Sequence, residues 1–281
     1  MKTLLVVDGH HLLFKMFYGM PSRIIGKNGK SVHAIIGFTG ALLKVINMTR
    51  PTEIVVVFDS ENGSDRNQLN PEYKGNRVDY TDVPTDDNPF SQLNDIYIVL
   101  DYLRIKHFES FNGNEADDHI TSYVNSYKNT HKVYILSGDT DFMQLVDENV
   151  NLFVYRGKKS IVYNREMVYE KFGIYPNYFA DYKCLVGDKS DNIKGVPTVG
   201  PKTATSLIDT YGGILNIIKS IELVRKTTLK MKLKEYTDML IQNYQLIKLD
   251  RKIDNPYEGE SLLWSSKDMK TLDILRSLDY M

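Results

Sequence analysis

The sequence has little cysteine and no long apolar run. Its 281 residues include a single cysteine, Cys184, which excludes an internal disulfide framework and any cluster of thiolate metal ligands. We interpret Cys184 as a small buried side chain. No apolar run approaches the roughly 20 residues of a membrane-spanning helix, and the first residues lead into a short apolar stretch ending at Asp8, unlike a signal peptide. These absences predict a cytoplasmic globular protein without membrane association.

The sequence also has no excess of charge of either sign. It contains 35 Lys and Arg against 36 Asp and Glu, for a formal net charge of -1. Such a total offers no global electrostatic argument for nucleic-acid binding. It leaves room for local patches of opposite sign, so the arrangement of the charges matters more than their sum.

Short β-branched runs alternate with helical patterns in the first half of the chain. Strands are predicted over 3–7, 54–58 and 133–136, weaker strands over 105–108 and 151–155, and helices over 32–46 and 90–103. This alternation predicts an α/β fold with a mostly parallel central sheet and helices on both faces, and it leaves the strand order open. Helical patterns dominate after about residue 165.

Acidic residues follow the predicted strands. Asp8 and Asp59 end the first two, and Asp139 and Asp141 follow the third. Because ligand sites of open parallel sheets form outside the carboxyl ends of the strands, we expect these acids to converge. Two further groups carry acids three residues apart: Glu115, Asp117 and Asp118, and Asp188 and Asp191.

Each acid alone has an ordinary structural explanation as a turn former or helix cap. Nine carboxylates at one sheet edge, however, would repel one another unless cations neutralised them. Oxygen ligands without cysteine or a compact histidine cluster favour Mg²⁺ or Mn²⁺ over zinc. Two such ions suit in-line attack on a phosphodiester. His10 and His11 follow Asp8. Contact with the site is one interpretation, and a helix-start or surface role is the stronger one.

Residues 61–89 form a long polar stretch, which is typical of a functional or mobile segment. Near its start, Tyr73, Lys74 and Arg77 lie within about one helical turn if the segment is helical. The aromatic ring could then stack on an unpaired base while the cations meet phosphate. In isolation, a solvated helix with Tyr73 packed inward is the stronger interpretation.

A second phosphate-binding candidate is the glycine-rich turn around Gly195, Val196 and Gly200, followed by Lys202 and Thr203 at a helix start. Such a turn and helix N-terminus can bind phosphate without reading bases. The alternative is a plain packing element between two helices. Farther on, basic residues outnumber acidic ones, as expected for a helix that follows a duplex backbone or for a solvated helix face: Lys219, Arg225, Lys226, Lys230, Lys232 and Lys234.

In their order and spacing these motifs resemble the 5′-nuclease family, which includes the 5′→3′ exonuclease domain of bacterial DNA polymerase I and the phage and stand-alone bacterial flap endonucleases. The matching segments are VVDG, VVFDS, PEYKGNR, NEADD, SGDTD, GDKSDN and GVPTVGPKTA. The resemblance implies a PIN-like core over 1–175 with a helical arch near 61–89. It further implies a helical region over 176–281 with a helix-hairpin-helix near 183–210.

The resemblance also implies roles for individual residues. The nine acids match the family's metal ligands for two or more Mg²⁺ ions, with Mn²⁺ as a substitute, and the helix-hairpin-helix would bind K⁺. Lys74 and Arg77 match arch residues that contact the scissile phosphate, Tyr73 lies beside them, and Lys15 stands at a basic position near the active site. The second half of the arch is acidic, with Asp79, Asp82, Asp86 and Asp87, whereas an arch that binds a threaded 5′ strand by charge alone would be basic.

The sequence therefore predicts a structure-selective, metal-dependent nuclease of replication and repair. It would act as a monomer on DNA with 5′ flaps or 5′ ends, and the sequence leaves open whether RNA-primed ends are among its substrates. One competing interpretation is a PIN-type ribonuclease acting on single-stranded RNA. Another is a catalytically silent protein that binds DNA junctions, which the intact acidic set argues against.

Overall fold

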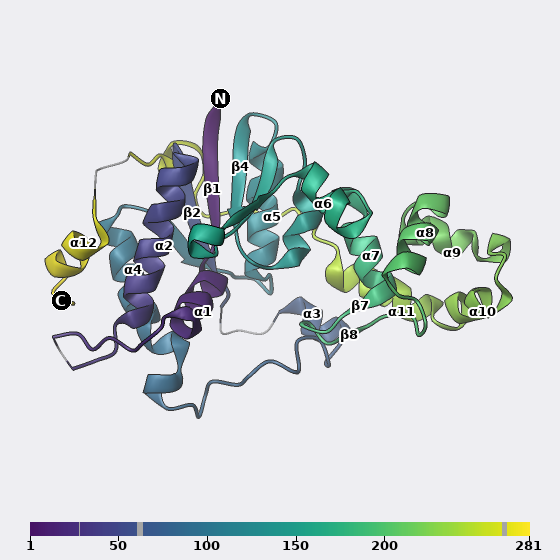
Figure 1. Ribbon diagram of the computed structural model, residues 1–281, viewed down its shortest axis with the longest axis horizontal. Coiled ribbons are helices and arrows are strands. Elements are labelled where there is room, and N and C mark those ends of the chain that lie inside the picture. The colour runs from purple at the N-terminus through teal and green to yellow at the C-terminus, as the bar shows by residue number, and fades with distance from the viewer. Residues whose placement is uncertain (28, 61–63, 266–268) are drawn as a thin grey trace.

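A six-stranded sheet forms the centre of the computed structural model (Figure 1), which describes residues 1–27, 29–60, 64–265 and 269–281. Its strand order is β3-β2-β1-β4-β5-β6. The strands are β1 (Lys2–Asp8), β2 (Glu53–Phe58), β3 (Lys106–Glu109), β4 (His131–Leu136), β5 (Val150–Val154) and β6 (Ile161–Tyr163). All neighbouring pairs are parallel except β5 and β6. The predicted α/β class with a mostly parallel sheet is confirmed.

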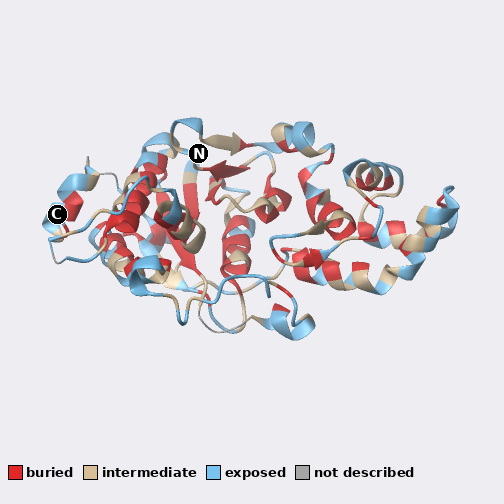
Figure 2. Cartoon of the chain, turned by 60° about the horizontal axis from the view of Figure 1, so that its bottom comes forward, coloured by how far each residue is buried: buried red, intermediate tan, exposed pale blue. Residues whose placement is uncertain are grey.

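Both faces of the sheet are buried. Along β1, Leu5 and Val7 pack into one apolar cluster, while Leu4 and Val6 pack into another on the opposite face, as the two-residue period of a strand requires. Buried residues accordingly line the sheet on both sides in Figure 2. The first cluster is covered by α1 (Gly9–Gly19), α2 (His33–Thr49), α4 (Leu93–Tyr102) and α12 (Thr271–Ser277), and the second by α5 (Ala116–Tyr127).

The helical region continues the second apolar cluster away from the sheet (Figure 1). It contains α6 (Arg165–Phe172), α7 (Phe179–Val186), α8 (Pro201–Tyr211), α9 (Ile214–Lys219), α10 (Thr227–Glu235) and α11 (Thr237–Ile247). A small hairpin of β7 (Gly187–Asp188) and β8 (Ile193–Lys194) joins α7 to α8. Short 3₁₀ helices occur at η1 (Thr85–Asp87), η2 (Pro89–Gln92), η3 (Thr140–Leu145), η4 (Gly157–Lys159), η5 (Pro176–Tyr178), η6 (Ile221–Leu223) and η7 (Gly259–Leu262). None of the described helices is long and apolar enough to cross a membrane.

The predicted helical arch is mostly not helical in this structure. Within 64–88, helix is limited to α3 (Asp65–Leu69) and η1, and 61–63 lie outside the described residues. The segment that carries Tyr73, Lys74 and Arg77 forms turns instead of the expected helical turn. Lys74 has a positive φ of 55°, and Pro84 and Pro89 remove backbone donors, so the local chemistry opposes a continuous helix.

After α11 the chain returns to the sheet-containing core as an extended tail along α5. Ser122 Oγ donates to the Ile253 carbonyl at 2.6 Å, and Tyr123 Oη to the Tyr257 carbonyl at 2.9 Å. Farther along, Trp264 N donates to the Thr52 carbonyl at 2.9 Å, just before β2. The tail thus connects the helical region to the sheet before α12 completes the core.

Candidate functional site

Carboxylates at the strand ends line one cavity of about 1030 Å³. Asp8, Asp59, Asp117 and Asp139 all contribute to its wall. Asp8 ends β1 and caps α1, since it accepts a hydrogen bond from His11 N at 2.9 Å. Asp59 follows β2 and accepts from Ala116 N at 2.8 Å. The parallel strands therefore bring acids that are far apart in sequence to one edge of the sheet.

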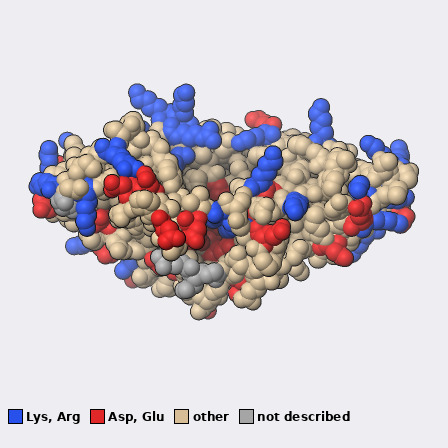
Figure 3. Space-filling model, turned by 90° about the horizontal axis from the view of Figure 1, so that it is seen from below, with Lys and Arg blue, Asp and Glu red and all other residues tan. Residues whose placement is uncertain are grey.

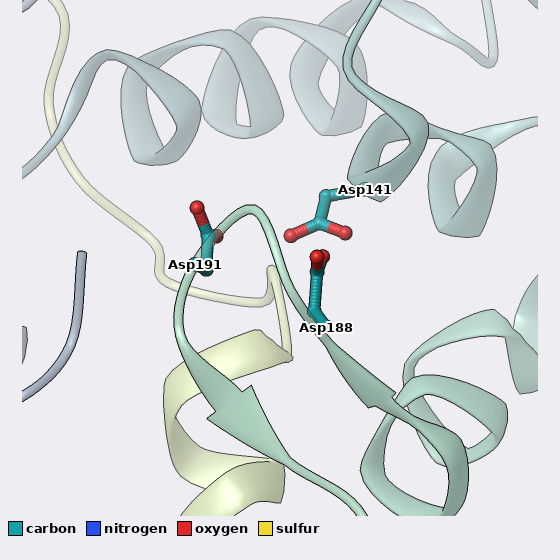
Figure 4. A group of neighbouring side chains, drawn as sticks. All are labelled: Asp141, Asp188 and Asp191. Atoms are coloured by element: carbon teal, nitrogen blue, oxygen red, sulfur yellow. The ribbon is translucent and has the colours of Figure 1, made fainter. Parts of the chain in front are cut away.

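A second carboxylate group consists of Asp141, Asp188 and Asp191. Each offers an oxygen, and the three oxygens lie within 4.8 Å of one another. Asp141 comes from η3, whereas Asp188 and Asp191 come from the hairpin between β7 and β8, with Asp141 and Asp188 facing each other (Figure 4). Three converging carboxylates of this kind form a donor set suited to a hard divalent cation.

A lysine that sequence analysis missed lies within this second group. Lys183, on α7, bonds through its ammonium to both Asp141 and Asp188. It is nearly buried, with a side-chain exposure of 9%. Its position one and a half helical turns before Asp188 was the available signal, but nothing local indicated the contact with Asp141.

Burial raises the pKa values of several of these acids. It raises the pKa of Asp141 to about 7, helped by the nearby charge of Asp139. Burial also raises the pKa values of Asp8, Asp117 and Asp191. Asp59 is different, because a hydrogen bond from His10 and the charge of Lys74 outweigh its burial and lower its pKa. A cation in the site would favour the ionised form of these buried carboxyl groups and so lower their pKa values again.

Glu115 is held by donors from the base of the polar segment. Its oxygens accept from Ser64 Oγ at 2.7 Å and Lys74 Nζ at 2.8 Å, and from Tyr73 Oη at 3.3 Å. Tyr73 is therefore buried, with 4% of its surface exposed. The predicted stacking of its ring on a base does not fit this structure, and the inward-packed alternative does.

Asp118, which the sequence predicts as a metal ligand, is not among the described residues that line the cavity. Its two oxygens accept from Arg66 Nη1 at 2.7 Å and Nη2 at 2.8 Å, and it is fully buried. It also accepts from Glu115 N at 3.0 Å, as part of the capping box of α5. A carboxylate with these partners supports the start of α5.

The other predicted cations differ in their placement. Arg77 lines the cavity and donates to Asp191 at 3.0 Å, and Lys74 also lines it. Lys15 is not among the described residues that line the cavity. It is partly buried on α1, where burial and the nearby charge of Arg156 lower its pKa. Lys15 therefore belongs to the side of the core that carries Arg156.

His10 and His11 line the cavity, the contact that the sequence allowed but did not favour. His10 Nδ1 accepts from Asp59 N at 3.1 Å. Its ring packs edge-on against Phe14, Phe58 and Phe90. Their position directly after Asp8, at the carboxyl end of β1, was the signal that could have identified them.

The glycine-rich turn precedes α8 as expected. Gly195 lies against the preceding chain, since a Cβ there would be 2.3 Å from the Val186 carbonyl carbon. Gly200 is the N-cap of α8, with exposed Lys202 and partly exposed Thr203 in the first turn. Val196 is buried and donates to the Leu185 carbonyl at 2.9 Å. It therefore stabilises the turn, and its predicted contact with DNA does not fit.

Charges are segregated on the face that carries the site. Acidic side chains gather in the central hollow, and Lys and Arg side chains project along one long edge (Figure 3). The predicted basic stripe is partly neutralised, because Glu222 pairs with both Lys230 and Lys234. The balanced net charge thus hides an acidic hollow within a more basic surface.

Two family descriptions together match nearly the whole chain. Residues 3–173 match the family described as 5′-3′ exonuclease, N-terminal resolvase-like domain, and residues 174–270 match 5′-3′ exonuclease, C-terminal SAM fold. The chain is 34% identical over 274 residues to the 5′-3′ exonuclease of Aquifex aeolicus, covering 97% of this chain and 90% of that protein. It is 35% identical over 248 residues to DNA polymerase I of Caldicellulosiruptor bescii, covering 86% of this chain and 28% of the polymerase.

Solved structures share the fold at lower identity. The bacteriophage T5 flap endonuclease, in a pseudo-enzyme-product complex with DNA and metal ions, has a TM-score of 0.75 and 23% identity. The alignment covers 88% of this chain and 89% of that one. The T5 5′-exonuclease with bound zinc has a TM-score of 0.73 and 24% identity, covering 88% of this chain and 90% of that one.

Proposed function

The chain belongs to the 5′-3′ exonuclease family, and we propose that it hydrolyses DNA phosphodiester bonds at 5′ flaps and 5′ ends with the help of divalent metal ions. The observation that carries this proposal is the pair of adjoining carboxylate groups, one of them beside Lys74 and Arg77. Anionic ligands next to cationic side chains suit a site that holds metal and phosphate together.

The residues fit hard metal ions, Mg²⁺ in particular and Mn²⁺ as a substitute. All donors are carboxylate oxygens. One ion would be held by Asp141, Asp188 and Asp191, and another by Asp8, Asp59, Asp117 and Asp139. Glu115, which accepts from Lys74, would add a further negative charge nearby. Bound metal would lower the pKa of a water molecule and stabilise negative charge on the leaving oxygen.

The chain's own cations would act on the substrate phosphate. Lys74 Nζ and Arg77 Nη2 each bond to a carboxylate at the site, at 2.8 and 3.0 Å. Both lie on the segment that borders the cavity, so a phosphate entering there would meet two positive charges. Their role is to orient the phosphate and to stabilise the charge that develops on it.

The glycine-rich turn and the first turn of α8 would bind the duplex. A helix N-terminus with Lys202 and Thr203 suits phosphate oxygens, and we propose a K⁺ ion at this turn. The duplex would then be held beside the site while the single-stranded 5′ end reaches the carboxylates.

A fluorescent 5′-flap substrate tests this proposal. We expect cleavage with Mg²⁺ that leaves a 5′-phosphate and stops when a chelator is added. Asp139→Asn should abolish turnover and leave flap binding largely intact, while Asp279→Asn, an exposed acid paired with Lys27, should cleave normally. A folded wild-type protein without chelator-sensitive cleavage would refute the proposal. Faster cleavage of single-stranded RNA than of flap DNA would favour the ribonuclease interpretation.

A further inference from the structure

The carboxyl-terminal end of α11 meets two buried side chains of the catalytic core. Arg66 Nε donates to the Leu246 carbonyl at 2.9 Å, and Gln144 Nε2 donates to the Ile247 carbonyl at 3.1 Å. Arg66 is 1% and Gln144 8% exposed. The last carbonyls of a helix have no partner within it, and the Arg66 charge also suits the negative end of the helix dipole. Two core residues thus complete the end of α11.

Each of these residues comes from an element that interacts with the candidate metal ligands. Arg66 grips Asp118 with two hydrogen bonds, and Asp118 directly follows Asp117 on α5. Gln144 belongs to η3 and lies three residues after Asp141 on the same short helix. The side chains that hold α11 therefore also hold, or belong to, the elements that position carboxylates.

At its other contacts α11 holds the phosphate-binding turn. Asn243 Nδ2 donates to the Lys194 carbonyl at 2.8 Å and to the Cys184 carbonyl at 3.3 Å. Lys194 immediately precedes Gly195, where the turn begins. Hydrogen bonds thus join α11 to Arg66, which holds Asp118 beside Asp117, and to Gln144 on the short helix of Asp141, while Asn243 joins α11 to the turn before α8.

We propose that Arg66 and Gln144 are positioning residues that fix the distance between the duplex-binding turn and the carboxylates, and so determine which phosphodiester bond is cut. This inference rests on the proposed nuclease function. A turn that binds backbone phosphates reads no base sequence. The number of nucleotides between the duplex end and the cut is therefore set by protein geometry, and small displacements of reacting groups matter for the reaction.

Mapping of the cut position tests the proposal. A flap substrate of defined sequence is cleaved by wild type, Arg66→Gln, Gln144→Ala and a control, Gln242→Ala. Gln242 Nε2 donates to the Leu69 carbonyl at 2.8 Å, so it also joins α11 to α3, the helix that carries Arg66, but from a half-exposed position and at the last residue of that helix. We expect one main product from wild type and Gln242→Ala. The two positioning variants should cut neighbouring bonds at least tenfold more often. Slower cleavage at an unchanged position would overturn the proposal.

A distance measurement decides the matter without any cleavage. Spin labels at Lys44→Cys on α2 and Lys219→Cys on α9 report on the core and the helical region, since both positions are exposed and native Cys184 is buried. Pulsed electron paramagnetic resonance should give a narrow distance distribution for the otherwise wild-type protein and a broader one with Gln144→Ala. An unchanged distance distribution would contradict the positioning role of Gln144 even if flaps are cleaved. Absence of wild-type cleavage would refute only the proposed function. If Arg66→Gln does not fold, Gln144→Ala alone decides.

Discussion

The ammonium group of Lys183 bonds to the carboxylate of Asp141, within a group of acids that has the donor set for a divalent cation. The charges of Asp141 and Asp139 outweigh the burial of this lysine and raise its pKa, so it remains charged. Lys183 therefore neutralises the second carboxylate group in the absence of metal. A metal ion that binds there must share the carboxylates with this cation.

Removal of Lys183 should make the fold depend more on metal. In Lys183→Met, Asp141 and Asp188 lose their common partner, so the metal-free protein should melt several degrees lower. Ca²⁺ should then stabilise this variant more than wild type, and with a lower midpoint concentration. Thermal melts over a Ca²⁺ series measure both effects. Lys171→Met, an exposed lysine on α6, is the control, and an unchanged Ca²⁺ midpoint in Lys183→Met would contradict the prediction.

Lys74→Ala should reduce the rate of cleavage far more than binding. Loss of a cation that stabilises developing charge costs about 10²–10³-fold in rate. Single-turnover cleavage of a 5′ flap with saturating enzyme measures the rate, and fluorescence anisotropy in Ca²⁺ measures binding. Lys194→Ala removes a lysine with 78% side-chain exposure from the neighbouring hairpin and should leave the rate near wild type. Equal losses of rate and affinity in Lys74→Ala would remove it from the reacting centre.

Metal binding should become tighter as pH rises to about 7 and then level off. Burial and Asp139 raise the pKa of Asp141 to about 7, and a ligand must lose its proton before it binds metal. Below pH 7 the apparent Ca²⁺ affinity should fall by up to about tenfold per pH unit. Calorimetric titrations between pH 5.5 and 8.5 check this, and a constant affinity over that range would contradict it.

The same raised pKa affects stability without metal. The folded protein keeps a proton on Asp141 that the unfolded chain, with an ordinary value of 3.8, has already released. Its contribution to stability is therefore fully present below about pH 4 and is lost as pH rises through about 7. Urea unfolding in the presence of chelator should show that Asp141→Asn becomes more stable relative to wild type over this interval.

Two glycines of the same turn should differ in their tolerance of alanine. A Cβ at Gly195 would lie 2.3 Å from the Val186 carbonyl carbon and 2.5 Å from Gly187 N, whereas a Cβ at Gly200 has no heavy atom within 4 Å. Gly195→Ala should cost about 1–3 kcal/mol of unfolding free energy, and Gly200→Ala less than about 1 kcal/mol. Urea denaturation of both variants measures this, and equal costs would show that the turn adapts.

Asp117 and Asp118 should respond differently to the same substitution. Asp117→Asn removes a carboxylate from the cavity and should weaken Ca²⁺ binding at nearly unchanged stability. Asp118→Asn removes the closer of the two carboxylates that pair with buried Arg66, since Glu115 lies 3.3 Å away. We expect a cost of about 3 kcal/mol, with the Ca²⁺ affinity of the folded protein retained. Melting curves and calorimetry on both variants separate these effects. Equal losses of Ca²⁺ affinity in Asp117→Asn and Asp118→Asn would show that Asp118 is also a metal ligand.

Local sequence patterns predicted the elements of the fold well. The runs at 3–7, 54–58 and 133–136 form strands, and Asp8 and Asp59 follow their strands at the edge that carries the cavity. This worked because a strand and the residue after it are determined by adjacent side chains. The strand order was not predictable, since pairing of β1 with both β2 and β4 joins residues about 50 and 130 positions apart.

The errors at the site arose where long-range partners decide a side chain's role. The three-residue spacing of Glu115 and Asp118 correctly predicted that they are neighbours, but it could not show that Arg66 occupies Asp118 from 52 positions away. Lys183 was missed for the same reason, because its partner Asp141 is 42 positions away. Spacing reports proximity along one helix and says nothing of what another element brings against it.

The course of the tail along α5 gives the helical region an unusual topological status. The chain leaves the core after β6, builds α6 to α11, and then returns through Ile253 and Tyr257 to α5 and through Trp264 to the start of β2, before α12 packs on α2. The helical region is therefore an insertion within the core, held by two covalent tethers. Both covalent connections of the helical region run to the core, and the returning one is hydrogen-bonded to α5. We therefore expect any displacement of the helical region on duplex binding to be transmitted to the helix that carries Asp117.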